Sequence, residues 1–203
     1  MPYTTLSRVK SLAQIEYEHL KFDTDSEYDA LVNQLIENAE SVVDNFCQVD
    51  EGFFDAGGIT ITDEYHDFRT KYIQLNNGPV ISITTLSINT AAYGSTPSWD
   101  LVDAENRYLN KKTGVVYLYN LTFHVTEQNV KVTYVAGFSA TPNNVRYVTE
   151  QLCSNILHVV LQRKVSPIVR VDEWAVRMAD PKIFTPELKQ MLKKYRVIEA
   201  SSG

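Results

Sequence analysis

Residues 26 to 47 read SEYDALVNQLIENAESVVDNFC, and this stretch decides the helical part of the fold. Its apolar side chains recur every three or four residues and so share one face of a helix. Those side chains are Leu31, Leu35, Ala39, Val42, Val43 and Phe46. Ser26 and Asp29 resemble a capping box, which marks a helix start. The sequence therefore predicts a long helix from about 26 to 47, with its apolar stripe facing the core.

A second long helical pattern can cover that stripe. Thr141 is expected to cap it and Pro142 to be its first helical residue, because proline suits the first turn. The pattern runs over residues 142–164 with its own apolar stripe, which consists of Val145, Val148, Leu152, Ile156, Val159 and Val160. A short helix over residues 5–12, capped by Thr5, is expected as a minor element.

Between the two long helices the apolar pattern changes to alternation, which indicates β-strands. We expect a mostly antiparallel β region over residues 57–137, with strands at 59–62, 72–75, 80–88, 108–110, 115–119 and 130–136. A bulge near Thr84 and Thr85 would keep the apolar residues on both sides of it facing inward. The predicted fold class is α+β: a helical core of two long helices with an inserted antiparallel β region and a C-terminal arm ending in a short helix.

The C-terminal segment predicts a short helix over about residues 186–196. Thr185 is its expected cap, Pro186 its first residue, and Leu188, Met191, Leu192 and Tyr195 form its apolar stripe. A helix of about ten residues is too short to be stable alone, so it needs a surface to pack on, in this chain or in another. We divide the chain into a body, residues 1–164, and an arm, residues 165–203.

Composition and charge limit the classes of protein to which this chain can belong. The chain has 203 residues, 44% of them hydrophobic, which suits one folded, soluble domain, alone or with an arm. We find neither the roughly 18 apolar residues in a row that a membrane span needs nor a secretory signal. Residues 1–162 hold 10 Lys and Arg against 20 Asp and Glu, whereas residues 163–196 hold 9 against 4. The acidic body argues against nucleic-acid binding, and the basic segment either meets another partner or folds back on the body.

Motifs of known enzyme chemistry are missing from the sequence, and we predict no catalytic, cofactor or metal site. The main cluster of ionisable residues is Asp63, Glu64, His66 and Asp67, which could hold a metal but reads better as a solvated loop. The carboxylates of Asp100, Asp103 and Glu105 are interpreted as surface groups. The histidines His19, His124 and His158 have no partner nearby in the sequence. Asn120 lies in a glycosylation sequon that we interpret as a chance match. Cys47 and Cys153 are expected to be buried, apolar residues.

Four motifs in the same order give the chain a resemblance to a known family. They are DALVNQLIENA at 29–39, YIQLNNGPVISI at 72–83, VKVTYVAGF at 130–138 followed by Pro142, and TPEL with Leu192, Tyr195 and Arg196 at 185–196. Together they resemble the head-tail connector proteins of tailed bacteriophages, also called head-completion or adaptor proteins. The excess length relative to compact members of that family lies in residues 88–128 and in the arm.

The resemblance implies a non-enzymatic structural protein of the virion neck, made in the host cytoplasm. It implies a ring of about twelve copies on the portal protein. This ring would complete the head, pass DNA without binding it specifically, and provide the seat for the stopper or tail-completion protein. An acidic body suits a channel for DNA. The alternatives are a tail-terminator or tail-completion protein and, in a different class, an enzyme with an unrecognised site in the β region.

In such a protein the C-terminal arm is expected to bind the portal. The expected apolar anchors are Trp174, Met178, Leu188, Met191, Leu192 and Tyr195, and the complementary charges are Arg177, Lys189, Lys193, Lys194 and Arg196. Packing within the chain is the alternative for Trp174 and Tyr195. The sequence leaves open what the loop from Asn89 to Ser98 does; it could contact the next neck protein, and the edge strands could pair between copies.

Overall fold

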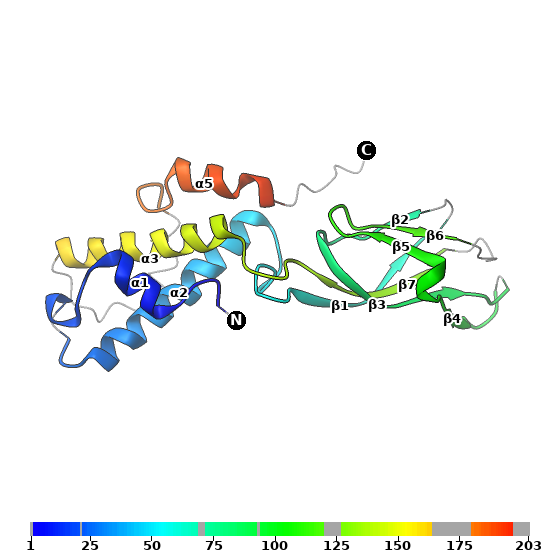
Figure 1. Ribbon diagram of the computed structural model, residues 1–203, viewed down its shortest axis with the longest axis horizontal. Coiled ribbons are helices and arrows are strands. Elements are labelled where there is room, and N and C mark those ends of the chain that lie inside the picture. The colour runs from blue at the N-terminus through cyan, green and yellow to red at the C-terminus, as the bar shows by residue number, and fades with distance from the viewer. Residues whose placement is uncertain are drawn as a thin grey trace. The chain divides into compact units, whose positions relative to one another are not determined.

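The computed structural model describes residues 2–20, 22–68, 72–92, 94–119, 127–163 and 180–196, without the side chains of residues 162 and 163. The chain divides into two compact units (Figure 1). Residues 1–54 and 141–203 form the helical unit, and residues 55–140 form the β unit. The predicted boundary between body and arm near residue 164 lies outside the described residues and stays a prediction.

Four α-helices build the described part of the helical unit: α1 (Leu6–Ala13), α2 (Asp25–Cys47), α3 (Asn143–Arg163) and α5 (Pro186–Leu192). Helix α3 packs against each of the other three (Figure 1). The predicted core of two long helices is therefore wrong, because the short helices α1 and α5 also bury apolar side chains: Val9 and Ala13 from α1, and Leu188 and Leu192 from α5. Short helices need such packing to be stable.

The helix boundaries lie close to those predicted, and Thr5 precedes α1 as its predicted cap, but the starts of α2 and α3 differ in detail. Thr24, and not Ser26, caps α2, and its hydroxyl accepts a hydrogen bond of 3.3 Å from the Glu27 N–H. Helix α3 begins at Asn143, one residue after Pro142, whose carbonyl accepts a hydrogen bond from the Arg146 N–H. Both thiols, those of Cys47 and Cys153, are fully buried, as predicted.

Polar contacts fasten the N-terminal residues to α2 and α3. Tyr3 donates its hydroxyl to Asp44 Oδ1 at 2.6 Å, and the hydroxyl of Thr4 donates to Glu150 Oε1 at 2.8 Å. Arg8 Nε also donates to Glu150 Oε1, at 2.6 Å. These bonds satisfy two carboxylates that are almost fully buried, and an unsatisfied carboxylate there would cost stability.

The β unit consists of two antiparallel sheets. One has the order β1-β7-β3-β4, from strands Ile59–His66, Val130–Ala136, Val80–Asn89 and Trp99–Leu101. The other has the order β2-β6-β5, from strands Tyr72–Gln74, Val115–Leu118 and Arg107–Asn110. Strand β4 was not predicted, and η2 (Ala104–Asn106) is a short 3-10 helix before β5.

The two sheets form two layers with a shared core (Figure 1). Ile73 and Val116 of the three-stranded sheet are buried, as are Leu86, Val132 and Tyr134 of the other. The pairing of β3 with β7 shifts between Ile83 and Thr85, so the predicted bulge is confirmed. Beyond the bulge, Leu86 and Ile88 are buried on the inner face.

Candidate partner-binding surfaces

The C-terminal helix α5 is anchored to the helical unit. Thr185 caps it, its hydroxyl accepting from the Leu188 N–H at 3.5 Å, and Pro186 is its first residue, both as predicted. The side-chain amide of Asn155 donates to the carbonyl of Ile183 at 3.1 Å. The ring of Phe184 lies edge-on to that of Phe46, with centroids 5.2 Å apart. The arm therefore ends in a helix that belongs to the helical core.

The residues predicted to bind a portal fall into three groups. Leu188 and Leu192 are buried, Lys189, Met191 and Tyr195 are partly exposed, and Lys193, Lys194 and Arg196 are exposed. Trp174, Arg177 and Met178 lie outside the described residues. The ring of Tyr195 also contacts that of Phe54, with centroids 5.7 Å apart, so it packs within the chain.

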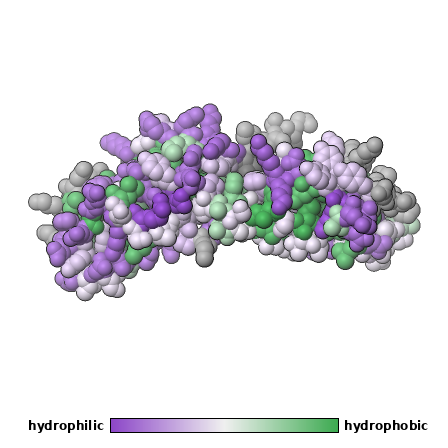
Figure 2. Space-filling model, in the orientation of Figure 1, coloured by the Kyte–Doolittle hydropathy of each residue, from purple (hydrophilic) through white to green (hydrophobic). Residues whose placement is uncertain are grey.

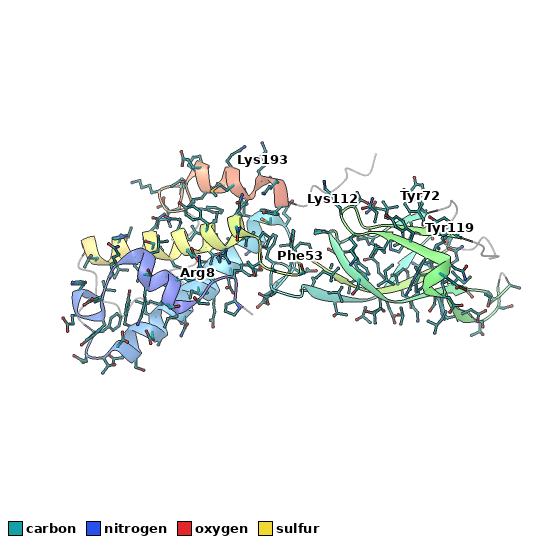
Figure 3. All side chains as sticks on the ribbon, in the orientation of Figure 1. Arg8, Phe53, Tyr72, Lys112, Tyr119 and Lys193 are labelled. Atoms are coloured by element: carbon teal, nitrogen blue, oxygen red, sulfur yellow. The ribbon has the colours of Figure 1, made fainter. Side chains whose placement is uncertain are left out.

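The basic groups of this region gather on the exposed side of α5 and of the following η3 (Lys193–Tyr195). Lys193 projects away from α3 (Figure 3). The ammonium of Lys189 lies 5.1 Å from the ring centre of Phe184, and that of Lys194 lies 4.8 Å from that of Tyr195. These contacts hold the side-chain stems on aromatic surface and leave the charges available to an acidic partner.

The β unit carries exposed aromatic residues that the sequence reasoning missed. Tyr72, Tyr117 and Tyr108 stand in register on neighbouring strands β2, β6 and β5, and 37 to 56% of each is exposed. Figure 2 shows hydrophilic residues over most of the visible helical unit and a group of hydrophobic residues on the β unit. Tyr117 and Tyr119, which alternate with Val116 and Leu118, were the available signal, because alternation puts them on the face opposite these buried residues.

The predicted loop with Asp63, Glu64, His66 and Asp67 is largely strand β1. Glu64 points inward, where its carboxylate accepts from His66 Nε2 and from the Tyr134 hydroxyl, both at 2.6 Å, and from the Asn76 N–H at 2.9 Å. These bonds hold β1 to β7 and to the turn after β2. Among the described residues, no group of three or more His, Cys, Asp or Glu side chains is placed to hold a metal ion.

Burial governs the pKa values of the most enclosed ionisable groups. It raises the pKa of the Cys47 thiol to about 12, with a smaller contribution from Asp44, and it also raises that of Cys153. Both thiols are therefore protonated near neutral pH and are poor nucleophiles. The described helices include none that is long and apolar enough to cross a membrane.

Comparisons with known proteins bear on the fold. No protein-family model and no curated protein matches the chain. Among solved structures, the chain resembles one from the neck of an empty GTA particle computed with C6 symmetry, with a TM-score of 0.56 and 12% identity. That alignment covers 99% of this chain and 93% of the other. A chain from the virion of a native gene transfer agent particle also aligns, with a TM-score of 0.43, 14% identity and coverage of 100% and 97%.

At this identity the first of these alignments establishes a shared fold and nothing finer. The fold is shared over nearly the whole length of both chains, so it includes both the helical unit and the β unit. A protein with this fold occurs in the neck of a GTA particle.

Proposed function

We propose that this protein is a structural component of the neck of a tailed-phage-like particle, where it acts as the head-tail connector. The observation that carries the proposal is the fold shared over 99% of the chain with a protein from a GTA neck. The four sequence motifs that resemble phage connectors support it independently, because that resemblance depends on the residues and not on the fold. The described residues of both units form packed cores, which suits a structural role.

The proposed connector forms a ring of about twelve copies beneath the portal, and the ring seats the stopper or tail. The exposed cations of α5 and η3 are the proposed portal contacts, together with Met191 and Tyr195 beside them. The buried Leu188 and Leu192 hold the helix in place for this contact. Trp174, Arg177 and Met178 remain part of the proposed portal-binding set.

Co-sedimentation with tail-less capsids that carry the cognate portal tests the proposal. The wild type should sediment with capsids that have a portal and not with capsids that lack one. The double substitution Lys193→Glu with Lys194→Glu should weaken binding by about tenfold or more at low ionic strength. The matched control, Lys193→Arg with Lys194→Arg, keeps both charges and should bind as the wild type does. Equal binding by all three proteins would remove these lysines from the portal contact.

The net charge of −6 supports a further part of the proposal, a channel that does not hold DNA. Exposed carboxylates such as Glu37 and Asp50 would repel phosphates at a channel wall. Replacing these acidic residues by lysine should slow DNA ejection from reconstituted particles. Unchanged ejection and unchanged retention of packaged DNA would contradict the channel role.

A further inference from the structure

The turn that joins β2 to β3 contains Asn77-Gly78, which is the one Asn-Gly pair in the sequence. The amide carbon of an asparagine side chain can be attacked by the backbone nitrogen of the next residue. Glycine favours this attack, because it has no Cβ to crowd the nitrogen or to restrict the backbone. Asn77 and Gly78 are both partly exposed, so solvent reaches the pair. The pair therefore has the composition and the access that spontaneous deamidation requires.

The backbone nitrogen of Gly78 is available as the nucleophile. Over the described parts of the chain, its N–H donates to no acceptor. The ends of the turn are bonded, because the Leu75 N–H donates to the carbonyl of Gly114 at 3.0 Å. The Val80 N–H donates to the carbonyl of Lys111 at 2.8 Å. A donated N–H would first have to give up its hydrogen bond, and the Gly78 nitrogen is spared that cost.

Asn77 lies beside the carboxylate that joins the segments of the β unit. Its backbone N–H donates to the Tyr134 hydroxyl at 3.2 Å, and that hydroxyl donates to Glu64 Oε2 at 2.6 Å. The preceding N–H, that of Asn76, donates to Glu64 Oε1 at 2.9 Å. Asn77 and Glu64 thus bond to the same hydroxyl. A new carboxylate at position 77 would therefore stand close to a carboxylate already present.

We propose that Asn77 deamidates spontaneously in the folded protein and that this modification weakens the β unit. The Gly78 nitrogen bonds to Cγ of Asn77, the bond from Cγ to Nδ2 breaks, and Nδ2 leaves as ammonia. Solvent carries the proton that the Gly78 nitrogen loses to the departing ammonia. Water then opens the cyclic imide at either of its carbonyls, which gives an aspartate or an isoaspartate. The reaction consumes water alone.

Both products disturb the hydrogen bonds around Glu64. Each adds a negative charge near the Glu64 carboxylate, and like charges at short range repel each other. The isoaspartate also lengthens the backbone by one carbon atom. The N–H groups of Asn76 and Asn77 would then shift relative to Glu64 and Tyr134, and donors lost from a part-buried carboxylate cost stability. This consequence concerns the β unit and does not depend on the proposed connector function.

Incubation of the full-length protein in mildly alkaline buffer tests the proposal, because base accelerates the attack. Peptide mass mapping over time should find the mass change of deamidation at Asn77, with release of ammonia. Asn110, in the turn between β5 and β6, is a reference within the same molecule, since lysine follows it. It should react about tenfold or more slowly, because the side chain of Lys111 restricts the attacking nitrogen.

Gly78→Ala is the matched variant and should slow the reaction at Asn77 by about tenfold or more. An added Cβ there would lie 3.6 Å from the carbonyl oxygen of Thr113, which is an ordinary contact, so the variant should fold as the wild type does. Urea unfolding followed by circular dichroism measures the effect of the modification. Incubation should lower the urea midpoint of the wild type and leave that of Gly78→Ala nearly unchanged.

Asn77→Asp reproduces the aspartate product without incubation and should also lower the urea midpoint. Two results would overturn the inference. One is an Asn77 that stays intact in the folded protein under conditions in which the urea-unfolded chain is deamidated there. The other is a deamidated protein whose urea midpoint equals that of the fresh protein.

Discussion

Glu64 joins three segments of the β unit through one carboxylate. Burial by itself would raise the pKa of Glu64, but the hydrogen bonds from His66, Tyr134 and the Asn76 N–H outweigh it and lower that pKa. The pKa of the Tyr134 hydroxyl is raised, mostly by burial and in part by its hydrogen bond to Glu64. A group whose pKa is lowered by folding stabilises the folded state above its ordinary pKa and loses this effect as the pH falls.

Glu64→Gln should therefore destabilise the protein near neutral pH by about 1 to 3 kcal/mol, because it removes the charge that three donors stabilise. Urea unfolding followed by circular dichroism at pH 7 and at pH 3 measures the difference. The loss should shrink at pH 3, because below the ordinary pKa of 4.5 the carboxyl of the unfolded chain takes up a proton before the folded one does, which reduces the stabilising effect of the charge. Glu105→Gln, at an exposed position, should change little at either pH. An equal loss for Glu64→Gln at both pH values would contradict this account.

Gly58 lies where β1 begins beside the end of β7. Its φ is +66°, and a Cβ there would stand 2.0 Å from the carbonyl oxygen of Ala136. Gly58→Ala should therefore cost about 2 to 5 kcal/mol of stability. Gly94→Ala is the control, because Gly94 has a φ of +83° with no atom within 4 Å of the added Cβ, and it should cost about 1 to 2 kcal/mol. Thermal or urea unfolding measures both losses of stability. Equal losses for Gly58→Ala and Gly94→Ala would show that the contact with Ala136 is unimportant.

At the scale of elements, the sequence predicted most helices and strands but misjudged the role of the short ones. Helix α1 was expected to be minor, yet Val9 is fully buried and Arg8 bonds to Glu150 of α3. Caps and apolar periodicity report where a helix begins and ends. They do not report what it packs on, because that depends on residues far away in the sequence.

Helix α5 offers a direct test of this packing. Leu192 is fully buried although it belongs to a seven-residue helix near the end of the described chain. Leu192→Ala should lower the free energy of unfolding by about 2 to 5 kcal/mol. Lys193→Ala, one residue further and exposed, should stay within about 0.5 kcal/mol of the wild type. A loss below about 1 kcal/mol for Leu192→Ala would mean that α5 contributes little to the core.

The candidate surfaces were only partly predictable from the sequence, because they too depend on how distant segments pack. The cations after Leu192 were evident in the sequence, because charge needs no knowledge of packing. The exposed row of tyrosines on the three-stranded sheet was not evident, since Tyr72, Tyr108 and Tyr117 come from three strands whose pairing is set by turns and register. Strand β4 was missed because three residues, Trp99 to Leu101, are too few for a visible alternation.

At the scale of the whole molecule, the uneven distribution of charge has a functional consequence. The basic residues from 163 to 196 are expected to meet an acidic partner surface, whereas the rest of the chain is acidic. Binding to portal-bearing capsids should therefore weaken as the salt concentration rises from about 50 mM to 500 mM, because screening shortens the reach of these charges. Co-sedimentation over that range measures the effect. Binding that is insensitive to salt would assign the contact to apolar residues alone.

We propose that this protein completes the head of a tailed-phage-like particle at the portal. Electron microscopy of tail-less, portal-bearing capsids mixed with the purified protein is the decisive test of this role. We expect additional ring-shaped density at one vertex of each capsid, on the portal, and none on capsids without a portal. Capsids that stay unchanged, with the protein bound instead to the ends of tail tubes, would rule out this role and favour a tail-terminator or tail-completion protein.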